Sequence, residues 1–335
     1  MWLAAFDTFR GSARSAELGA AVTDRLAHAA IPQPCRWVAL SDGGEGFLES
    51  MPGAPRPTEV TGPLGDPVTA TWKRDGAVGY IEMALASGLE LIGGAENNDA
   101  IAASTMGTGE LIAAAIEAGC REIVVGLGGS ATSDGGLGAV RVLENVRRRG
   151  VRLLAACDVD VNFIAAATMF ARQKGASDAA VGLLTRRLER VAQLYAQQFG
   201  VDVTSMAFAG SAGGLAGGLA AVGAELVSGA DFVIERLGIA EQLDEVAGVI
   251  TGEGSLDDQS LRGKCVGNLV ELCAAHGVAC LVIAGTTEDE AAARLRDLGA
   301  TVVDLCATYG VDAAWGQTAT VVSDAALDWV GGFAQ

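Results

Sequence analysis

The chain has 335 residues, half of them hydrophobic, with 46 glycines and a formal net charge of −18. This length accommodates one large or two medium-sized domains with a substantial core. The charge excludes nucleic acid and an anionic membrane as expected partners, because both bind basic surfaces. A phosphate ligand would need local amides, helix N-termini or a divalent cation to offset this charge.

The spacing of the seven cysteines and the composition of the N-terminal residues predict a cytoplasmic protein. No C-x-x-C pair occurs, so we expect free, mostly buried thiols in a reducing compartment. No basic region precedes an apolar segment at the N-terminus, so we expect no signal peptide. The uncharged run 203–224 contains six glycines, which favours a buried loop and helix over a membrane span.

The first part of the chain is predicted to form a helix from Ser12 or Ser15 to about residue 30, then a strand at 37–40. The following loop, Ser41-Asp-Gly-Gly-Glu-Gly46, places two carboxylates among three glycines and favours a ligand or metal loop over a plain turn. Alternating residues then predict a β-hairpin at 58–61 and 68–72, with a third strand at 77–83. This antiparallel pattern indicates a second domain.

The middle of the chain is predicted to contain a helix at 110–118 and a strand at 123–127. The loop Gly128–Gly138 follows, with five glycines whose amides could cradle phosphate or a small hydroxy acid. Its polar side chains are Ser130, Thr132, Ser133 and Asp134. A strand at 153–157 then ends at Asp158, Lys174 lies in a short polar turn, and a helix is predicted at 185–199.

The last third is predicted to alternate strands and helices. A strand at 246–250 enters Thr251-Gly-Glu-Gly254, where the glycines flanking Glu253 predict a sharp bend or a close approach to a ligand. A helix at 265–275 and two further strands, at 279–284 and 301–305, predict a right-handed parallel sheet. Such sheets bind ligands beyond the carboxyl ends of their strands.

The polar side chains available at these strand ends suit phosphoryl transfer. Neither His28 nor His276 is near them, so a Ser-His-Asp triad or a histidine zinc site is not expected. In phosphoryl transfer, carboxylates hold Mg²⁺, amides and lysine neutralise the phosphates, and an aspartate accepts the hydroxyl proton. Lysine is scarce in this chain, which makes Lys264, in a glycine-containing loop, a notable candidate.

Over nearly its whole length the chain resembles bacterial glycerate kinases of type I. The matching segments are Ser41-Asp-Gly-Gly-Glu-Gly46, Val60-Thr-Gly-Pro-Leu-Gly-Asp-Pro67, Ile81-Glu-Met-Ala84, Gly107-Thr-Gly-Glu-Leu111, Gly126-Leu-Gly-Gly-Ser-Ala-Thr-Ser-Asp-Gly-Gly136, Gln173-Lys-Gly-Ala176, Ala212-Gly-Gly-Leu215, Thr251-Gly-Glu-Gly254 and Gly263-Lys264. The resemblance implies ATP-dependent, Mg²⁺-requiring phosphorylation of D-glycerate, commonly at the 2-hydroxyl.

The resemblance also implies two α/β domains with the active site in the cleft between them. We expect a discontinuous domain with a Rossmann- or flavodoxin-like parallel sheet, residues 1–60 plus 245–335, and a second domain with a mixed sheet, residues 61–244. The strands at 123–127 and 153–157 could belong to either domain. A small-molecule substrate is expected, and a homodimer is left open.

Three departures from the family pattern concern the acceptor. Asp7-Thr-Phe-Arg10 has arginine where the family usually has lysine, and Arg keeps the charge without the compact ammonium. Cys157-Asp-Val-Asp-Val-Asn162 replaces the family's C-D-V-T-N-P, and the stretch before Cys157 is shortened. A kinase of a related hydroxy acid, a kinase forming 3-phosphoglycerate, and a relative that only binds a metabolite or partner remain alternatives.

Residue roles carried by the resemblance are hypotheses. Asp158 or Asp257 is the general base, without a choice between them, and Lys264 is the third catalytic candidate. Asp42 and Glu253 are the candidates for binding Mg²⁺ or the glycerate hydroxyls. The other expected substrate- or nucleotide-binding residues are Asp7, Arg10, Glu45, Gly128, Gly129, Ser130, Thr132, Asp134, Lys174 and Gln259.

Overall fold

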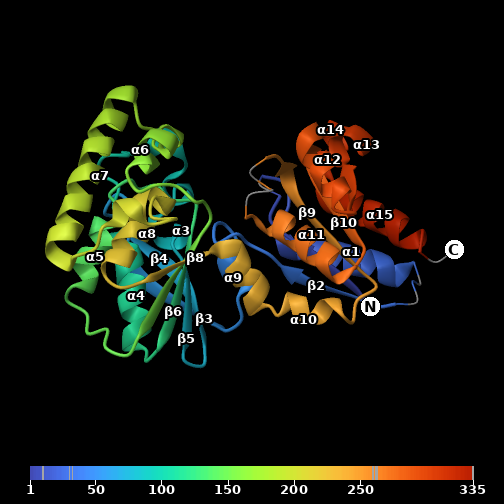
Figure 1. The fold of residues 1–335 in the computed structure, drawn as a ribbon, viewed down its shortest axis with the longest axis horizontal. Coiled ribbons are helices and arrows are strands. Elements are labelled where there is room, and N and C mark those ends of the chain that lie inside the picture. Colours follow the sequence, from blue (N-terminus) through green and yellow to red (C-terminus); the bar gives the residue numbers. More distant parts are fainter. Residues whose placement is uncertain (10, 30, 32, 259, 261–262, 334–335) are drawn as a thin grey trace. The chain divides into compact units, whose positions relative to one another are not determined.

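The structure is a computed structural model that describes residues 1–9, 11–29, 31, 33–258, 260 and 263–333. It divides into two compact units (Figure 1). The terminal unit is Met1–Asp42 with Ala230–Gln335, and the central unit is Gly43–Gly229. The expected domain boundaries after residues 60 and 244 stay predictions, although β3 (Ala54–Thr61) pairs within the sheet of the central unit.

The terminal unit contains a five-stranded parallel sheet in the order β11-β10-β9-β1-β2. Its strands are β1 (Trp2–Phe6), β2 (Cys35–Ala39), β9 (Gly248–Leu256), β10 (Cys280–Thr287) and β11 (Thr301–Asp304). Renumbered along the unit, this is the flavodoxin-like order 2-1-3-4-5. The predicted parallel sheet built from both chain ends is therefore confirmed, and its topological switch point lies between β1 and β9.

Helices complete the terminal unit. They are α1 (Ser15–His28), α9 (Gly229–Arg236), α10 (Ile239–Leu243), α11 (Cys265–His276), α12 (Asp289–Asp297), α13 (Leu305–Tyr309), α14 (Val311–Gly316) and α15 (Thr318–Gly331). Leu18 and Val22 of α1 and Val322 of α15 share one core with Ile250 and Ile283 of the sheet. Helix α11 also packs on β9 and β10, but its residues are not part of this core. Alternate residues of a strand face opposite sides of the sheet, so one strand can contact two separate layers of helices.

The glycines around Glu253 do not bend the chain as predicted. β9 continues through them to Leu256, and neither Gly252 nor Gly254 has positive φ. A Cβ on Gly252 would lie 2.0 Å from the carbonyl oxygen of Ile283 on β10. The sharp bend is therefore wrong, because glycine here lets two strands approach closely.

The central unit contains a six-stranded mixed sheet in the order β3-β4-β5-β6-β7-β8. Its further strands are β4 (Pro67–Asp75), β5 (Val78–Glu82), β6 (Glu122–Leu127), β7 (Arg152–Cys157) and β8 (Glu225–Ser228). β3, β4 and β5 pair antiparallel, which confirms the predicted hairpin and third strand, and β5 to β8 pair parallel. The mixed sheet expected for the second domain is thus present.

The helical segments of the central unit are α2 (Phe47–Ser50), α3 (Ala84–Ser87), η1 (Glu90–Ile92), η2 (Ala95–Asn97), α4 (Met106–Glu117), α5 (Leu137–Leu143), α6 (Ala165–Phe170), η3 (Arg172–Lys174), α7 (Asp178–Phe199), η4 (Val203–Ser205) and α8 (Ser211–Ala221). Helices α4, α5 and α8 share a core with β6 and β7. A second core joins α6, α7 and α8.

The uncharged run 203–224 forms η4 and the buried helix α8, as predicted. Within the described part of the chain, no helix has both the length and the apolar character needed to cross a membrane. All seven cysteines are free thiols, and five of them are buried.

Candidate active site

The terminal unit gathers three carboxylates at the carboxyl edge of its sheet. Asp7 directly follows β1, Asp42 follows β2, and Glu253 lies in β9, between β1 and β10. The backbone N–H of Asp7 donates to the carbonyl oxygen of Gly252 over 3.1 Å, which holds Asp7 beside β9. Lys264, just before α11, has its Nζ 4.0 Å from Oδ2 of Asp42. We call Asp7, Asp42, Glu253 and Lys264 the acidic cluster.

Burial and mutual repulsion raise the pKa values of two carboxyl groups in this cluster. Burial, and then the neighbouring charge of Asp42, raise the pKa of Asp7 well above its usual range, although the N–H of Thr8 donates to its Oδ1 over 2.6 Å. Burial is also the main cause that raises the pKa of Glu253 to about 7. The Oε1 of Glu253 is buried without a hydrogen-bond partner among the described residues. A cation bound here would stabilise the ionised form of these carboxyl groups.

The geometry leaves the magnesium prediction untested. Among the described residues, no three acidic, histidine or cysteine side chains are grouped closely enough to hold a metal ion. Mg²⁺ in kinases is nevertheless held by one or two carboxylates together with phosphate oxygens. The buried, unpartnered oxygen of Glu253 and the adjacent Asp42 fit such a partial site.

Asp257 forms hydrogen bonds within its own loop, which follows β9. The N–H and the hydroxyl of Ser260 donate to Oδ1 of Asp257 over 3.0 and 3.3 Å, and the Asp257 N–H donates back to Oγ of Ser260 over 3.1 Å. This reciprocal turn shapes the loop. Two predicted binding residues, Arg10 and Gln259, lie outside the described residues.

In the central unit, two glycine loops meet beyond β6 and β7. A Cβ on Gly128 would lie 2.4 Å from Cα of Gly44, and one on Gly43 would lie 2.5 Å from the carbonyl oxygen of Ala156. The first loop therefore crosses the ends of both strands, and only glycine permits this contact. Glu45 of this loop is exposed to solvent, as is Gly129.

Lys174 is the buried cation of this region. Its Nζ donates to Oγ of Ser130 over 2.6 Å and to the carbonyl oxygen of Thr132 over 2.7 Å. Burial lowers the pKa of Lys174 to about 8, and the nearby charges of Asp158 and Asp134 oppose this effect. We call Ser130, Thr132, Asp158 and Lys174 the lysine cluster.

Asp158 stands at the end of β7, next to the lysine. Its Oδ1 accepts a hydrogen bond of 2.6 Å from the hydroxyl of Ser211, at the start of α8. Two residues after it, Asp160 and Asn162, form hydrogen bonds with a neighbouring backbone segment. Asp160 accepts from the N–H of Phe208, and Asn162 donates to the carbonyl oxygen of Thr204. Asp160 and Asn162, which depart from the family pattern, thus anchor this loop, and Asp158 is present at the end of the strand.

The structure gives Asp134 a different task from the expected ligand contact. Its two oxygens accept four hydrogen bonds, from the N–H and hydroxyl of Thr105 and from the N–H groups of Gly136 and Gly138. These bonds tie the glycine loop to the starts of α4 and α5. A ligand-binding role for Asp134 stays a prediction.

Two residues of this region were absent from the sequence-based set. Asn98 donates through Nδ2 to the carbonyl oxygens of Ala131 and Lys174, over 2.9 and 2.8 Å. It therefore joins the glycine loop to the turn that carries the lysine. Ser211 orients Asp158. No local pattern marks Asn98, whereas Ser211 directly precedes the matching segment Ala212–Leu215.

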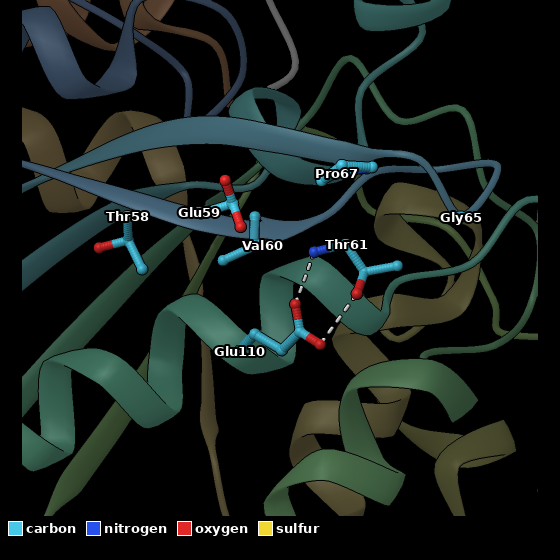
Figure 2. A pocket seen from close by; sticks show the side chains of 7 residues that line it. All are labelled: Thr58, Glu59, Val60, Thr61, Gly65, Pro67 and Glu110. Atoms are coloured by element: carbon cyan, nitrogen blue, oxygen red, sulfur yellow. Dashed lines mark hydrogen bonds between the residues drawn. The ribbon is translucent and has the colours of Figure 1, made fainter.

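A separate shallow pocket of about 350 Å³ lies between the hairpin and α4. It is lined by Thr58, Glu59, Val60, Thr61, Gly65, Pro67 and Glu110 (Figure 2). Figure 2 shows Glu110 turned toward Thr61, whose N–H and hydroxyl both donate to its carboxylate. None of the predicted site residues lines this pocket.

Comparisons with known proteins show the family of this chain. The profile of the glycerate kinase family matches residues 2–146 and 143–328. The chain is 37% identical over 292 residues to glycerate 2-kinase of Escherichia coli K12, covering 76% of each protein. It is 32% identical over 319 residues to glycerate kinase of Halalkalibacterium halodurans, covering 84% of each.

The fold has a counterpart among solved structures. A crystal structure from Salmonella typhimurium LT2, described as a candidate glycerate kinase 2, aligns with a TM-score of 0.80 at 28% identity. The alignment covers 99% of this chain and 98% of that chain. The chain therefore belongs to the glycerate kinase family and is an enzyme of the phosphotransferase class.

Proposed function

We propose that this enzyme phosphorylates D-glycerate with ATP and Mg²⁺ and forms 2-phosphoglycerate. Family membership and the glycerate 2-kinase of Escherichia coli among the relatives support the reaction. The observation that carries the proposal is the lysine cluster. Lys174 and Asp158 act on each other electrostatically at the ends of the central sheet. A hydroxy-acid acceptor requires such a pair, one cation for its negative charge and one carboxylate for its hydroxyl proton.

Asp158 is the general base in this proposal. It stands beside a buried ammonium group and is oriented by the Ser211 hydroxyl at 2.6 Å. Asp257, the other candidate, already accepts two hydrogen bonds from Ser260 on one oxygen, in a turn that holds its own loop. A base must reach the substrate hydroxyl, and a carboxylate that shapes a loop is less available for this contact.

The acidic cluster is the proposed place for the cation that accompanies ATP. Asp42 and Glu253 would hold Mg²⁺, which supplies neutralisation of phosphate charge when it is bound. Lys264, 4.0 Å from Asp42, would contact the same phosphates. Asp7 belongs to the same cluster, and burial and the charge of Asp42 raise the pKa of its carboxyl group. The exposed amide of Gly129 and the buried amide of Gly128 are further phosphate-binding candidates.

The test is ADP release with ATP, Mg²⁺ and D-glycerate, with enolase added to identify the product. Enolase accepts 2-phosphoglycerate and not 3-phosphoglycerate. We expect ADP release together with an enolase signal, both absent when glycerate is omitted. ADP release without an enolase signal would move the acceptor to the 3-hydroxyl. No ADP release with D-glycerate would refute the proposed substrate, and other small hydroxy acids would then be compared at fixed ATP.

A further inference from the structure

We propose that the lysine cluster is the carboxylate subsite of the hydroxy-acid acceptor, in which Lys174 and Ser130 donate to the carboxylate oxygens. This inference rests on the proposed function and refines it. It narrows the expectation that Ser130, Thr132 and Lys174 bind either the substrate or the nucleotide. It also gives the enzyme a physical basis for selecting acids over uncharged polyols.

Unused hydrogen-bond donors are the first observation. An ammonium group has three N–H donors, and Lys174 uses two of them, on Ser130 and on the carbonyl oxygen of Thr132. The Ser130 hydroxyl accepts one of these bonds, so its own hydrogen remains to be donated. The hydroxyl oxygens of Thr132 and Ser133 are buried without a partner among the described residues.

Buried polar groups are nearly always paired in native proteins, so several unpaired ones in neighbouring residues indicate a missing ligand. Ser130, Thr132, Ser133 and Lys174 are all less than a tenth exposed. The ligand must offer acceptor oxygens, because the lysine has only donors. Gly129, next to Ser130, is exposed, so the loop borders solvent and a small molecule can reach it.

The local charge favours a carboxylate over a polyphosphate. The charged groups that act on Lys174 are Asp158, after β7, and Asp134, in the glycine loop, and both are carboxylates. One ammonium facing two carboxylates cannot offset the several negative charges of a triphosphate. A substrate carboxylate adds a single negative charge, so these two carboxylates repel it less than they repel a triphosphate. The acidic cluster, with its place for a divalent cation, is the better site for phosphates.

The same arrangement explains a preference for the 2-hydroxyl. In a 2-hydroxy acid, the hydroxyl is on the carbon next to the carboxylate. A carboxylate bound at Lys174 therefore presents this hydroxyl to the neighbouring Asp158, whereas a 3-hydroxyl is one carbon further away. Asn98 holds the subsite in place, since its single amide group binds the backbone on both sides, at Ala131 and at Lys174.

The experiment measures binding by calorimetry, with D-glycerate and, separately, a non-hydrolysable ATP analogue with Mg²⁺. The variants are Ser130→Ala and Lys174→Met, and Lys73→Met is the matched control. Lys73 is a partly buried lysine of the same unit that donates to the carbonyl oxygen of Met51. We expect the Kd for D-glycerate to rise about 10- to 100-fold in Lys174→Met and about 5-fold in Ser130→Ala. The Kd for the ATP analogue should stay within about twofold in all three.

A pH series separates a direct contact from a structural role. The pKa of Lys174, lowered to about 8, means that the ammonium loses its proton as the pH rises through this value. Binding of D-glycerate to the wild type should therefore weaken above about pH 8, and Lys174→Met should lose this dependence. If Lys174→Met does not fold, Ser130→Ala decides, because it removes one donor and leaves the buried ammonium in place.

The outcomes distinguish this inference from the proposed function. A weaker affinity for the ATP analogue with unchanged affinity for D-glycerate would make the lysine cluster a phosphate site and overturn the inference. Unchanged affinities for both ligands in Ser130→Ala and Lys174→Met would also overturn it. If the wild type turned over another hydroxy acid and not D-glycerate, the proposed function would fail. The subsite would then be tested with that acid in the same variants.

Discussion

Glu253 is a buried carboxyl group whose protonation should be visible in protein stability. Burial raises its pKa to about 7, compared with 4.5 in water, so the folded state holds this proton more tightly than the unfolded state. The resulting stability is complete below about pH 4.5 and is lost as the pH rises through about 7. The difference corresponds to roughly 3 kcal/mol.

Replacing Glu253 with Gln should flatten this dependence. We expect the wild type to lose more free energy of unfolding between pH 5 and pH 8 than Glu253→Gln, measured by urea unfolding. Part of the dependence should remain, because the pKa of Asp7 is raised as well. Parallel curves for the two proteins would show that Glu253 is ionised in the folded state at neutral pH.

The two aspartates proposed earlier as alternatives for the general base give a second prediction. Asp158→Asn should lower kcat by about 10²- to 10⁴-fold, because an amide cannot accept the hydroxyl proton. Asp257→Asn should stay within about tenfold of wild type, because the Asn oxygen can still accept the bonds from Ser260. Thermal unfolding of both variants provides the folding control. The opposite order of activities would assign the base to Asp257.

At the scale of elements, the packing of β9 on β10 depends on Gly252. A methyl group there would lie 2.0 Å from the carbonyl oxygen of Ile283, inside a parallel sheet with little freedom to move. Gly252→Ala should lower the free energy of unfolding by about 2 kcal/mol or more. Gly316→Ala is the control, since nothing lies within 4 Å of its added Cβ. Equal stability of the two variants would contradict this account.

Two helices begin earlier than the sequence predicts, and both have tertiary or capping reasons. α4 begins at Met106, before the predicted Glu110, because Gly107 and Gly109 allow contact with Thr61 and Ala139. α7 begins at Asp178, where the Ser177 hydroxyl accepts from the N–H of Ala180. Glycine-rich segments resemble loops in a sequence, yet here they provide close helix packing.

For the whole molecule, the seven thiols offer a simple test of burial and of disulfide content. Cys35 and Cys306 are partly exposed, and the other five are buried. With a thiol reagent, the native protein should react promptly at no more than these two positions. All seven should react after unfolding in guanidinium without reductant. Fewer than seven in the unfolded protein would reveal a disulfide.

The sequence by itself determined the fold class and the chemistry on offer. Apolar runs of strand length alternating with helical patterns define parallel α/β sheets, because the period of side-chain burial is a local property. The hairpin was equally predictable from the alternation of apolar and polar residues in its strands. Acids and glycines after the strands ending at Leu40, Leu127 and Cys157 marked the sheet edges. Scarce lysine drew attention to Lys174 and Lys264.

Only the tertiary structure decided how these groups are arranged. In the folded chain, Lys174 donates a hydrogen bond to Ser130, and Asp134 accepts hydrogen bonds from backbone amides. The fold also brings Asn98 and Ser211 into this region. These contacts join residues that are distant in the chain, and no local pattern encodes them. Burial, which sets the pKa of Glu253 and Lys174, likewise depends on what packs around a side chain and not on its neighbours in sequence.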